Sequence, residues 1–124
     1  MTPLTRELVD SVGDAFNAND VDAVMTHFAE DATFDHAIGP EEHGIRFEGA
    51  ETIRGVFSAL FDRVESVHWE TMDCAIAGNK AYCKYRRTAT NKDGSQETCL
   101  SVDILTYRDG LIRHKDTYYK QRTA

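Results

Sequence analysis

The first half of the chain repeats apolar residues at intervals of three or four positions, the spacing that places side chains on one face of a helix. Three such stripes predict three helices. Thr2-Pro3 is expected to begin the first helix, Asp20 to cap a short second one, and Ala50 to lie near the start of the third. The apolar positions of the stripes are Leu4, Leu8, Val12, Ala15 and Phe16; Val21, Val24, Met25 and Phe28; and Ile53, Val56, Phe57, Leu60, Phe61 and Val64.

From residue 68 onward the apolar period changes to two, the spacing of a strand with one buried face. A shorter strand is expected earlier, at Thr33–His36, where Gly39-Pro40 would break it and Glu41 to Arg46 would form a surface loop. Helices followed by an antiparallel meander predict an α+β fold. We expect one domain, residues 1–124, in which three N-terminal helices pack on a curved antiparallel sheet and enclose the pocket of a cone. Turn residues divide the second half into predicted strands at 68–77, 80–90, 97–107 and 111–122.

The composition narrows the possible partners. Hydrophobic residues make up 41% of the chain and charged residues 28%, the balance of a globular domain. The formal net charge of −7 argues against nucleic acid, no apolar run is long enough to span a membrane, and the N-terminal segment lacks the pattern of a secretory signal. The three cysteines lack metal-binding spacing and are expected to be reduced. These features predict a cytoplasmic protein without a cofactor, a metal, or a nucleic-acid or membrane partner.

Asp35-His36 is the first candidate for chemistry, because a carboxylate and an imidazole here adjoin many apolar residues. Neighbours in a regular strand point to opposite faces, so one side chain is expected to face inward and the other outward. Either residue could then move a proton, with a surface position for His36 as the alternative. No spacing requires a metal site built from this pair with His68 and Asp103.

Asp103 is the second candidate, in the third predicted strand of the meander. If its face of the strand is concave, the carboxyl is desolvated, which raises its pKa and suits a proton donor. If that face is outward, the carboxyl would pair with a cation such as Lys84 or Arg86. A hydrogen-bonded dyad of Asp103 with His36 would need both side chains to face inward. The residues that share the face of Asp103 are Cys99, Ser101, Leu105 and Tyr107.

Three segments carry a resemblance to a known family: FAEDATFDH at 28–36, FEGAETIRGVF at 47–57 and YRDGLIRHKDTYY at 107–119. With the order of elements, they make the chain similar to the nuclear transport factor 2-like superfamily, and to its SnoaL-like branch in particular. The superfamily includes ketosteroid isomerases, limonene epoxide hydrolases and polyketide cyclases. The resemblance implies a cone-shaped pocket for a small hydrophobic ligand. It also implies a homodimer formed through the outer sheet face, for which Tyr82, Arg86 and Thr88 are candidates.

The resemblance also suggests roles for single residues. The general base of ketosteroid isomerases falls on His36, next to Asp35, and their oxyanion-hole aspartate falls on Asp103. Their oxyanion-hole tyrosine falls on Val12, and the arginine of the epoxide hydrolases falls on Ser101. Both catalytic sets are therefore incomplete, whereas the looser demands of a SnoaL-type cyclase are met by His36 and Asp103.

We therefore expect a small cofactor-independent enzyme that performs acid–base chemistry (isomerisation, cyclisation or dehydration) on a hydrophobic carbonyl compound. Asp35 or His36 would move the proton, and Asp103 would orient the base or stabilise an enolate. A non-catalytic small-molecule-binding or accessory domain is the alternative. Either face of the last strand could turn inward, and alignment with the family favours the face of Lys115. The expected pocket residues are Phe16, Phe57, Leu60, Trp69, Tyr85, Lys115, Thr117 and Tyr119, of which Phe57 and Leu60 also suit the core.

Overall fold

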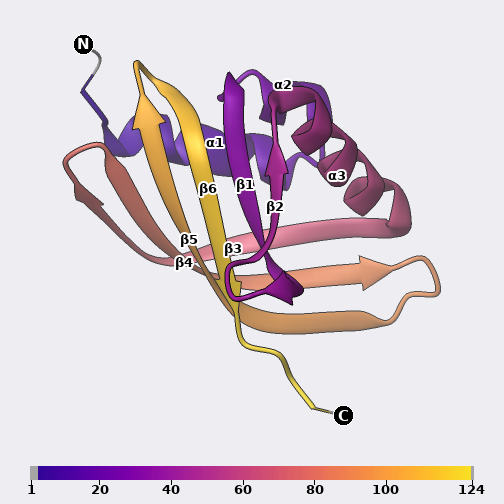
Figure 1. The fold of residues 1–124 in the computed structure, drawn as a ribbon. Helices are drawn as coiled ribbons and strands as arrows, with labels where there is room; N and C mark the ends of the chain where they lie inside the picture. The colour runs from indigo at the N-terminus through magenta and orange to yellow at the C-terminus, as the bar shows by residue number, and fades with distance from the viewer. Residues whose placement is uncertain (1–2, 124) are drawn as a thin grey trace.

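The computed structural model describes residues 3–123 of the chain. The chain forms three helices, α1 (Arg6–Asn17), α2 (Val21–Met25) and α3 (Ala50–Arg63), and Figure 1 shows their arrangement. The starts of α2 and α3 confirm the predictions from the sequence. At α2, the Asp20 carboxylate accepts hydrogen bonds from two backbone N–H groups in the first turn.

The start of α1 differs from the prediction. The N-cap is Thr5, whose hydroxyl accepts a hydrogen bond from the backbone N–H of Leu8 at 3.2 Å, and the helix begins at Arg6. Pro3 precedes the helix, and Thr2 lies outside the described residues. The Thr5 backbone is extended, which is the geometry a capping hydroxyl requires, so the second threonine of the segment takes the role predicted for the first.

The strands form one sheet in the order β2-β1-β6-β5-β4-β3. Strands β3 to β6 make the predicted antiparallel meander. Strand β1 runs parallel to β6, so the sheet is mixed at that pair, where the sequence predicted antiparallel strands throughout. Periodicity within one segment carries no information about which distant strand becomes its neighbour. The strands are β1 (Phe28–Glu41), β2 (Gly44–Glu48), β3 (Val64–Ala77), β4 (Lys80–Asn91), β5 (Gln96–Arg108) and β6 (Leu111–Tyr119).

Strand β1 is much longer than predicted and continues through Gly39-Pro40 to Glu41. Strand β2 folds back on it after a two-residue turn, so most of the predicted surface loop is a hairpin. The pairing register shifts just where Pro40 lies, and such an irregular stretch tolerates a residue without an N–H group. Gly44 closes the hairpin at φ +85°, and a side chain there would overlap the carbonyl oxygen of His36.

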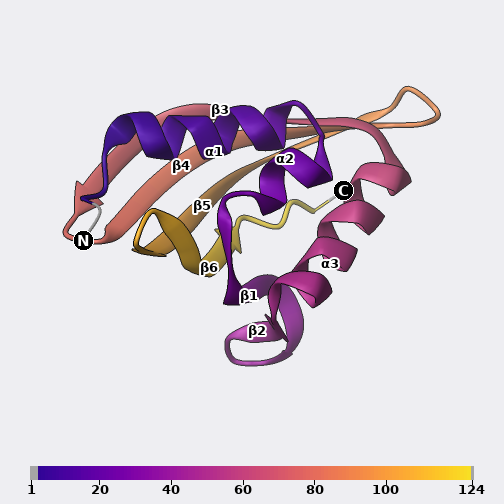
Figure 2. The same ribbon diagram turned by 90° about the horizontal axis from the view of Figure 1, so that it is seen from above.

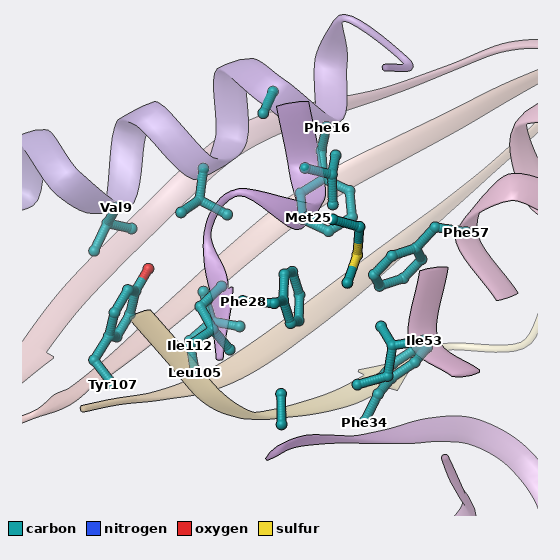
Figure 3. Close-up of a cluster of buried hydrophobic side chains, with 14 of the residues drawn as sticks. Val9, Phe16, Met25, Phe28, Phe34, Ile53, Phe57, Leu105, Tyr107 and Ile112 are labelled. Atoms are coloured by element: carbon teal, nitrogen blue, oxygen red, sulfur yellow. The ribbon is translucent and has the colours of Figure 1, made fainter. Parts of the chain in front are cut away.

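The sheet curls around the helices, as Figures 1 and 2 show. Helix α1 packs along β3, and α3 packs against β1, β2 and the start of β3. Between them lies an aromatic core, drawn in Figure 3, in which Phe16, Phe28, Phe34 and Phe57 meet with ring centroids 5.1 to 6.5 Å apart. Side chains therefore fill much of the concave side of the sheet.

The outer face of the meander is open to solvent. Tyr82 and Arg86 are exposed there and Thr88 is half-buried. These are the residues suggested for a dimer surface, and the homodimer stays a prediction, as does the cytoplasmic location. No helix within residues 3–123 combines the length and the apolar character needed to cross a membrane.

Candidate functional site

On the inner face of the sheet, residues that lie opposite one another on neighbouring strands form rows across the sheet. Burial alternates along β4 and β5, so paired positions on neighbouring strands share this face. Asp103 and Lys115 lie in adjacent rows on adjacent strands. The rows are Phe34–Lys115–Leu105–Ala81, then Thr117–Asp103–Cys83–Cys74, then Tyr119–Ser101–Tyr85–Thr71, and last Cys99–Arg87–Trp69.

Asp103 and Lys115 form a buried ion pair, with only 8% and 7% of each residue exposed. The Lys115 ammonium donates to Asp103 Oδ1 at 3.2 Å and to the Thr117 hydroxyl at 2.6 Å, and that hydroxyl donates to the same Oδ1 at 2.7 Å. Within residues 3–123 no donor reaches Oδ2, so this oxygen is available to a ligand. Lys84 and Arg86, the partners considered for an outward carboxyl, lie on the exposed face of β4.

The ammonium of Lys115 lies among aromatic rings. Its Nζ is 4.6 Å from the ring centroid of Phe34, 5.7 Å from that of Phe16 and 5.9 Å from that of Phe57. Ring faces attract a cation, and water is largely excluded here, so the interactions are stronger than in bulk solvent. The predicted partner of an inward Asp103 was His36, whereas in the structure the carboxylate pairs with the buried ammonium of Lys115.

A small cavity borders the ion pair. Its volume is about 20 Å³, room for roughly one water molecule. Among the predicted pocket residues, Phe16, Trp69, Tyr85 and Lys115 line the cavity together with Asp103. The sequence analysis missed three further lining residues, which are Val12, Gly13 and Leu105.

A larger groove of about 290 Å³ lies between α1 and the β3–β4 hairpin. Gly13 and Tyr85 line both this groove and the small cavity, so they form the wall between the two. The groove is also lined by Cys74 and Cys83, whose sulfur atoms are 3.4 Å apart and which are free thiols, as predicted. Burial raises the pKa of the Cys83 thiol to about 12.

The other predicted pocket residues have different surroundings. Phe57 is buried in the core, and Leu60 packs on a separate small cluster around Val67. Thr117 contacts the ion pair directly through its hydroxyl. Tyr119 is half-buried further along the inner face.

His36 lies on the inner face of β1 but does not pair with Asp103. Strand β6 lies between β1 and β5, so the backbones of β1 and β5 are about 10 Å apart. Thr117 of β6 bonds the carboxylate instead, and within residues 3–123 no hydrogen bond joins the two predicted partners. The His36 ring accepts a hydrogen bond from the Ile38 backbone N–H at 3.2 Å, and its centroid is 6.2 Å from that of Tyr119. Burial, with a contribution from nearby cations, lowers the pKa of His36, so the imidazole is neutral at pH 7.

Asp35 faces the outer side of β1. Its side chain is 4% exposed, and Arg46 binds it with both donors, Nε to Oδ1 at 2.7 Å and Nη2 to Oδ2 at 2.9 Å. This guanidinium, more than any other group, lowers the pKa of Asp35. The ligand atoms of Asp35, His114 and Asp116 lie within 4.8 Å of one another, the geometry of a potential metal cluster. Since both Asp35 oxygens already accept hydrogen bonds from Arg46, we interpret this group of residues as part of the Asp35–Arg46 ion pair and not as a metal site.

Comparison with known proteins extends this description. A model of the SnoaL-like domain family matches residues 9–115. A protein of ketosteroid isomerase-like fold from Catenulispora acidiphila, solved with trimethylamine, superposes with a TM-score of 0.80 at 25% identity, over 94% of this chain and 88% of that one. A candidate polyketide cyclase from Sinorhizobium meliloti gives a TM-score of 0.72 at 24% identity, over 91% and 94% of the two chains. TerC, co-crystallised with polyporic acid, gives 0.77 at 17% identity, over 92% and 89%. Curated proteins gave no match. The matches confirm the fold and the resemblance predicted from the sequence.

Proposed function

The chain belongs to the SnoaL-like domain family, and we propose that it is a small cofactor-independent enzyme that transfers protons on a hydrophobic carbonyl compound, by isomerisation, cyclisation or dehydration. One observation carries the proposal: a buried carboxylate with one free oxygen lies beside a buried ammonium, at the edge of a cavity lined mainly by apolar and aromatic side chains. The similarity to a candidate polyketide cyclase supports the same class of substrate.

In the proposed reaction, Asp103 Oδ2 accepts a proton from the carbon next to the carbonyl group. The Lys115 ammonium faces the same cavity and donates to the carbonyl oxygen as negative charge develops there. Thr117 holds Oδ1, which leaves Oδ2 as the basic oxygen. The proton is then returned to another carbon, or to a leaving oxygen in a dehydration. Asp35 has no role in this scheme because it lies on the outer face with Arg46.

A substrate of this kind needs more room than the small cavity offers, because ligand pockets usually measure about 300–1,000 Å³. The groove on the far side of Gly13 and Tyr85 provides about 290 Å³. Rotation of the Tyr85 side chain would join the two spaces beside the ion pair. We infer that the substrate is flat and enters with movement of this ring.

Deuterium incorporation tests the proposal without knowledge of the natural product. A panel of cyclic ketones headed by 2-tetralone is incubated in D₂O, and loss of the protons next to the carbonyl is followed by NMR. Wild-type protein should accelerate the exchange, and Asp103→Asn and Lys115→Met should each lower the catalysed rate by at least about 100-fold. Arg86→Gln, on the outer face, is the matched control. Equal rates in the wild type and in Asp103→Asn would contradict the proposal.

The alternative function is small-molecule binding without turnover. Two relatives of the same fold have been solved with small molecules, trimethylamine in one and polyporic acid in TerC. A binding domain would show ligand-dependent NMR shifts at Tyr85 and Trp69, together with deuterium incorporation no faster than in buffer. An enzyme would show both the shifts and the accelerated exchange.

A further inference from the structure

Within residues 3–123, three arginines of this acidic chain form no ion pair: Arg63, Arg87 and Arg122. The sequence holds 21 acidic and 14 basic residues. Arg122 donates to the Thr98 backbone carbonyl. Arg63 and Arg87 form no ion pair with any residue in the described range 3–123. The arginines that do form one are Arg6, Arg46, Arg54, Arg86, Arg108 and Arg113.

Arg87 lies on the inner face of the sheet. It is half-buried, and it alternates with the buried residues Tyr85 and Ala89 along β4. Its guanidinium carbon is 5.8 Å from the ring centroid of Trp69, a residue that lines the small cavity. The preceding residue, Arg86, points to the outer face and pairs there with Glu70 at 2.7 Å. Adjacent arginines thus have opposite surroundings, one satisfied by a carboxylate and the other facing the cavity side.

Further cations surround this end of the inner face. The positive charges of Lys115, Arg87 and Arg63 all act on the imidazole of His36 and favour its neutral form, in addition to the effect of burial. Arg87 and Arg63 also act on the half-buried hydroxyl of Tyr119. This end of the inner face therefore combines aromatic rings with the guanidinium of Arg87.

We propose that this end of the inner face binds the anionic group of the substrate, a carboxylate or a phenolate, with Arg87 as the principal contact. The inference rests on the proposed function and specifies its substrate class. A guanidinium with no internal partner is an effective binder of such a group, because it offers parallel donors and is weakly hydrated. The Trp69 ring attracts the guanidinium, whose carbon lies 5.8 Å from the ring centroid.

The strand registers set the size of the substrate. Arg87 lies four residues along β4 from Cys83, whose cross-strand partner is Asp103. That separation is about 13 Å between backbone positions. Both side chains lie on the inner face, and a ring system of one or two rings fits within this span. We therefore expect the substrate to carry its anionic group within about 13 Å of the reacting carbonyl group.

A pair of matched ligands tests this inference. Binding of 2-naphthoate and of the neutral 2-acetonaphthone is measured by calorimetry for the wild type, Arg87→Gln, Arg87→Lys and Arg86→Gln. Wild-type protein should prefer the carboxylate. Arg87→Gln should weaken 2-naphthoate by about 10-fold or more, consistent with loss of a charge-assisted hydrogen bond, with Arg87→Lys intermediate and Arg86→Gln unchanged. Thermal unfolding of each variant verifies that it is folded.

The inference is overturned if the wild type does not prefer the carboxylate, or if Arg86→Gln loses as much affinity as Arg87→Gln. Because binding is measured without turnover, this result is separate from the deuterium exchange that tests Asp103. Carboxylate preference without exchange would leave the anion site standing and remove the proposed reaction. Deuterium exchange without the preference for the carboxylate would support the proposed reaction and remove the anion site.

Discussion

Each face of the sheet holds a carboxylate paired with a cation from another strand, Asp103 with Lys115 on the inner face and Asp35 with Arg46 on the outer face. Both carboxylate side chains are nearly buried, at 12% and 4% exposure. The cations differ more, because the Lys115 side chain is 8% exposed among aromatic rings and that of Arg46 is 46% exposed. Similar pairs thus occupy two different environments.

The hydrogen bonds reveal what each pair can do. Arg46 occupies both oxygens of Asp35, so this carboxylate has little capacity to accept a proton and serves mainly to join β1 to β2. Both donors to Asp103 converge on Oδ1 and leave Oδ2 without a donor, and Asp103 lines the cavity. The inner pair therefore retains a free acid–base position, and the outer pair has none. Four experiments can break or sharpen this comparison.

The largest effect is expected from Lys115→Met. Removal of one partner leaves Asp103 buried without a cation, which typically costs about 3–5 kcal/mol of the free energy of unfolding. The deuterium exchange should be lost as well. The double variant Lys115→Met/Asp103→Asn should regain much of the stability, because two neutral side chains carry no uncompensated charge, but none of the exchange. Urea denaturation measures the free energy of unfolding of each variant. A double variant that exchanges deuterium would contradict the role of the pair.

Arg46→Met should have the next largest effect, on stability alone. The Asp35 carboxylate loses both of its strongest donors, at a cost of about 1–3 kcal/mol, and the exchange rate should be unchanged. The pH dependence gives a second readout. Because Arg46 lowers the folded-state pKa of Asp35, the stabilisation is complete above the unfolded-state value near 3.9 and is lost as the pH falls through the folded-state value. Acid unfolding of the variant should therefore begin at a higher pH than in the wild type.

The two regions also differ in how far the sequence could predict them. Strand alternation left either face of β5 possible for Asp103. The family resemblance favoured the inward face for Asp103 and for Lys115, but the ion pair between them was not predicted. The outer pair was not predicted, because the sequence placed Arg46 in a surface loop and the structure places it in β2. Only the hairpin of β1 and β2 brings it opposite Asp35, as its cross-strand partner. Local periodicity could not predict that pairing.

The same limit applies to the fold. The three helices, the cap at Asp20 and the meander follow from residues close together in sequence, and the structure confirms them. Phe28 and Val64, predicted at the ends of two helices, instead begin β1 and β3. The parallel pairing of β1 with β6 joins the first strand to the last, and packing of the whole chain determines it. That pairing also inserts β6 between His36 and Asp103, which explains why these two residues form no dyad.

Thr117→Val should give a smaller change that is confined to the inner face. The substitution keeps the shape of the side chain and removes the hydroxyl that links Lys115 to Asp103. We expect a loss of about 1 kcal/mol in stability and a roughly 10-fold lower exchange rate, because the carboxylate is less firmly oriented. Thr117→Ser should restore both. An exchange rate equal to that of the wild type would mean that the hydroxyl does not position the carboxylate.

The smallest expected effect is on the pH dependence of stability, which distinguishes His36 on the inner face from Asp35 on the outer face. The folded-state pKa of His36 is lower than its unfolded value near 6.5, so the unfolded chain binds more protons as the pH falls through that value. Stability should therefore decline gradually between pH 7 and 5, well above the range in which Asp35 titrates. His36→Gln should make this decline shallower, and His27→Gln should add a separate contribution, because burial also lowers the pKa of His27. Urea denaturation at closely spaced pH values resolves the two windows. An unchanged slope in His36→Gln would show that the imidazole is not desolvated.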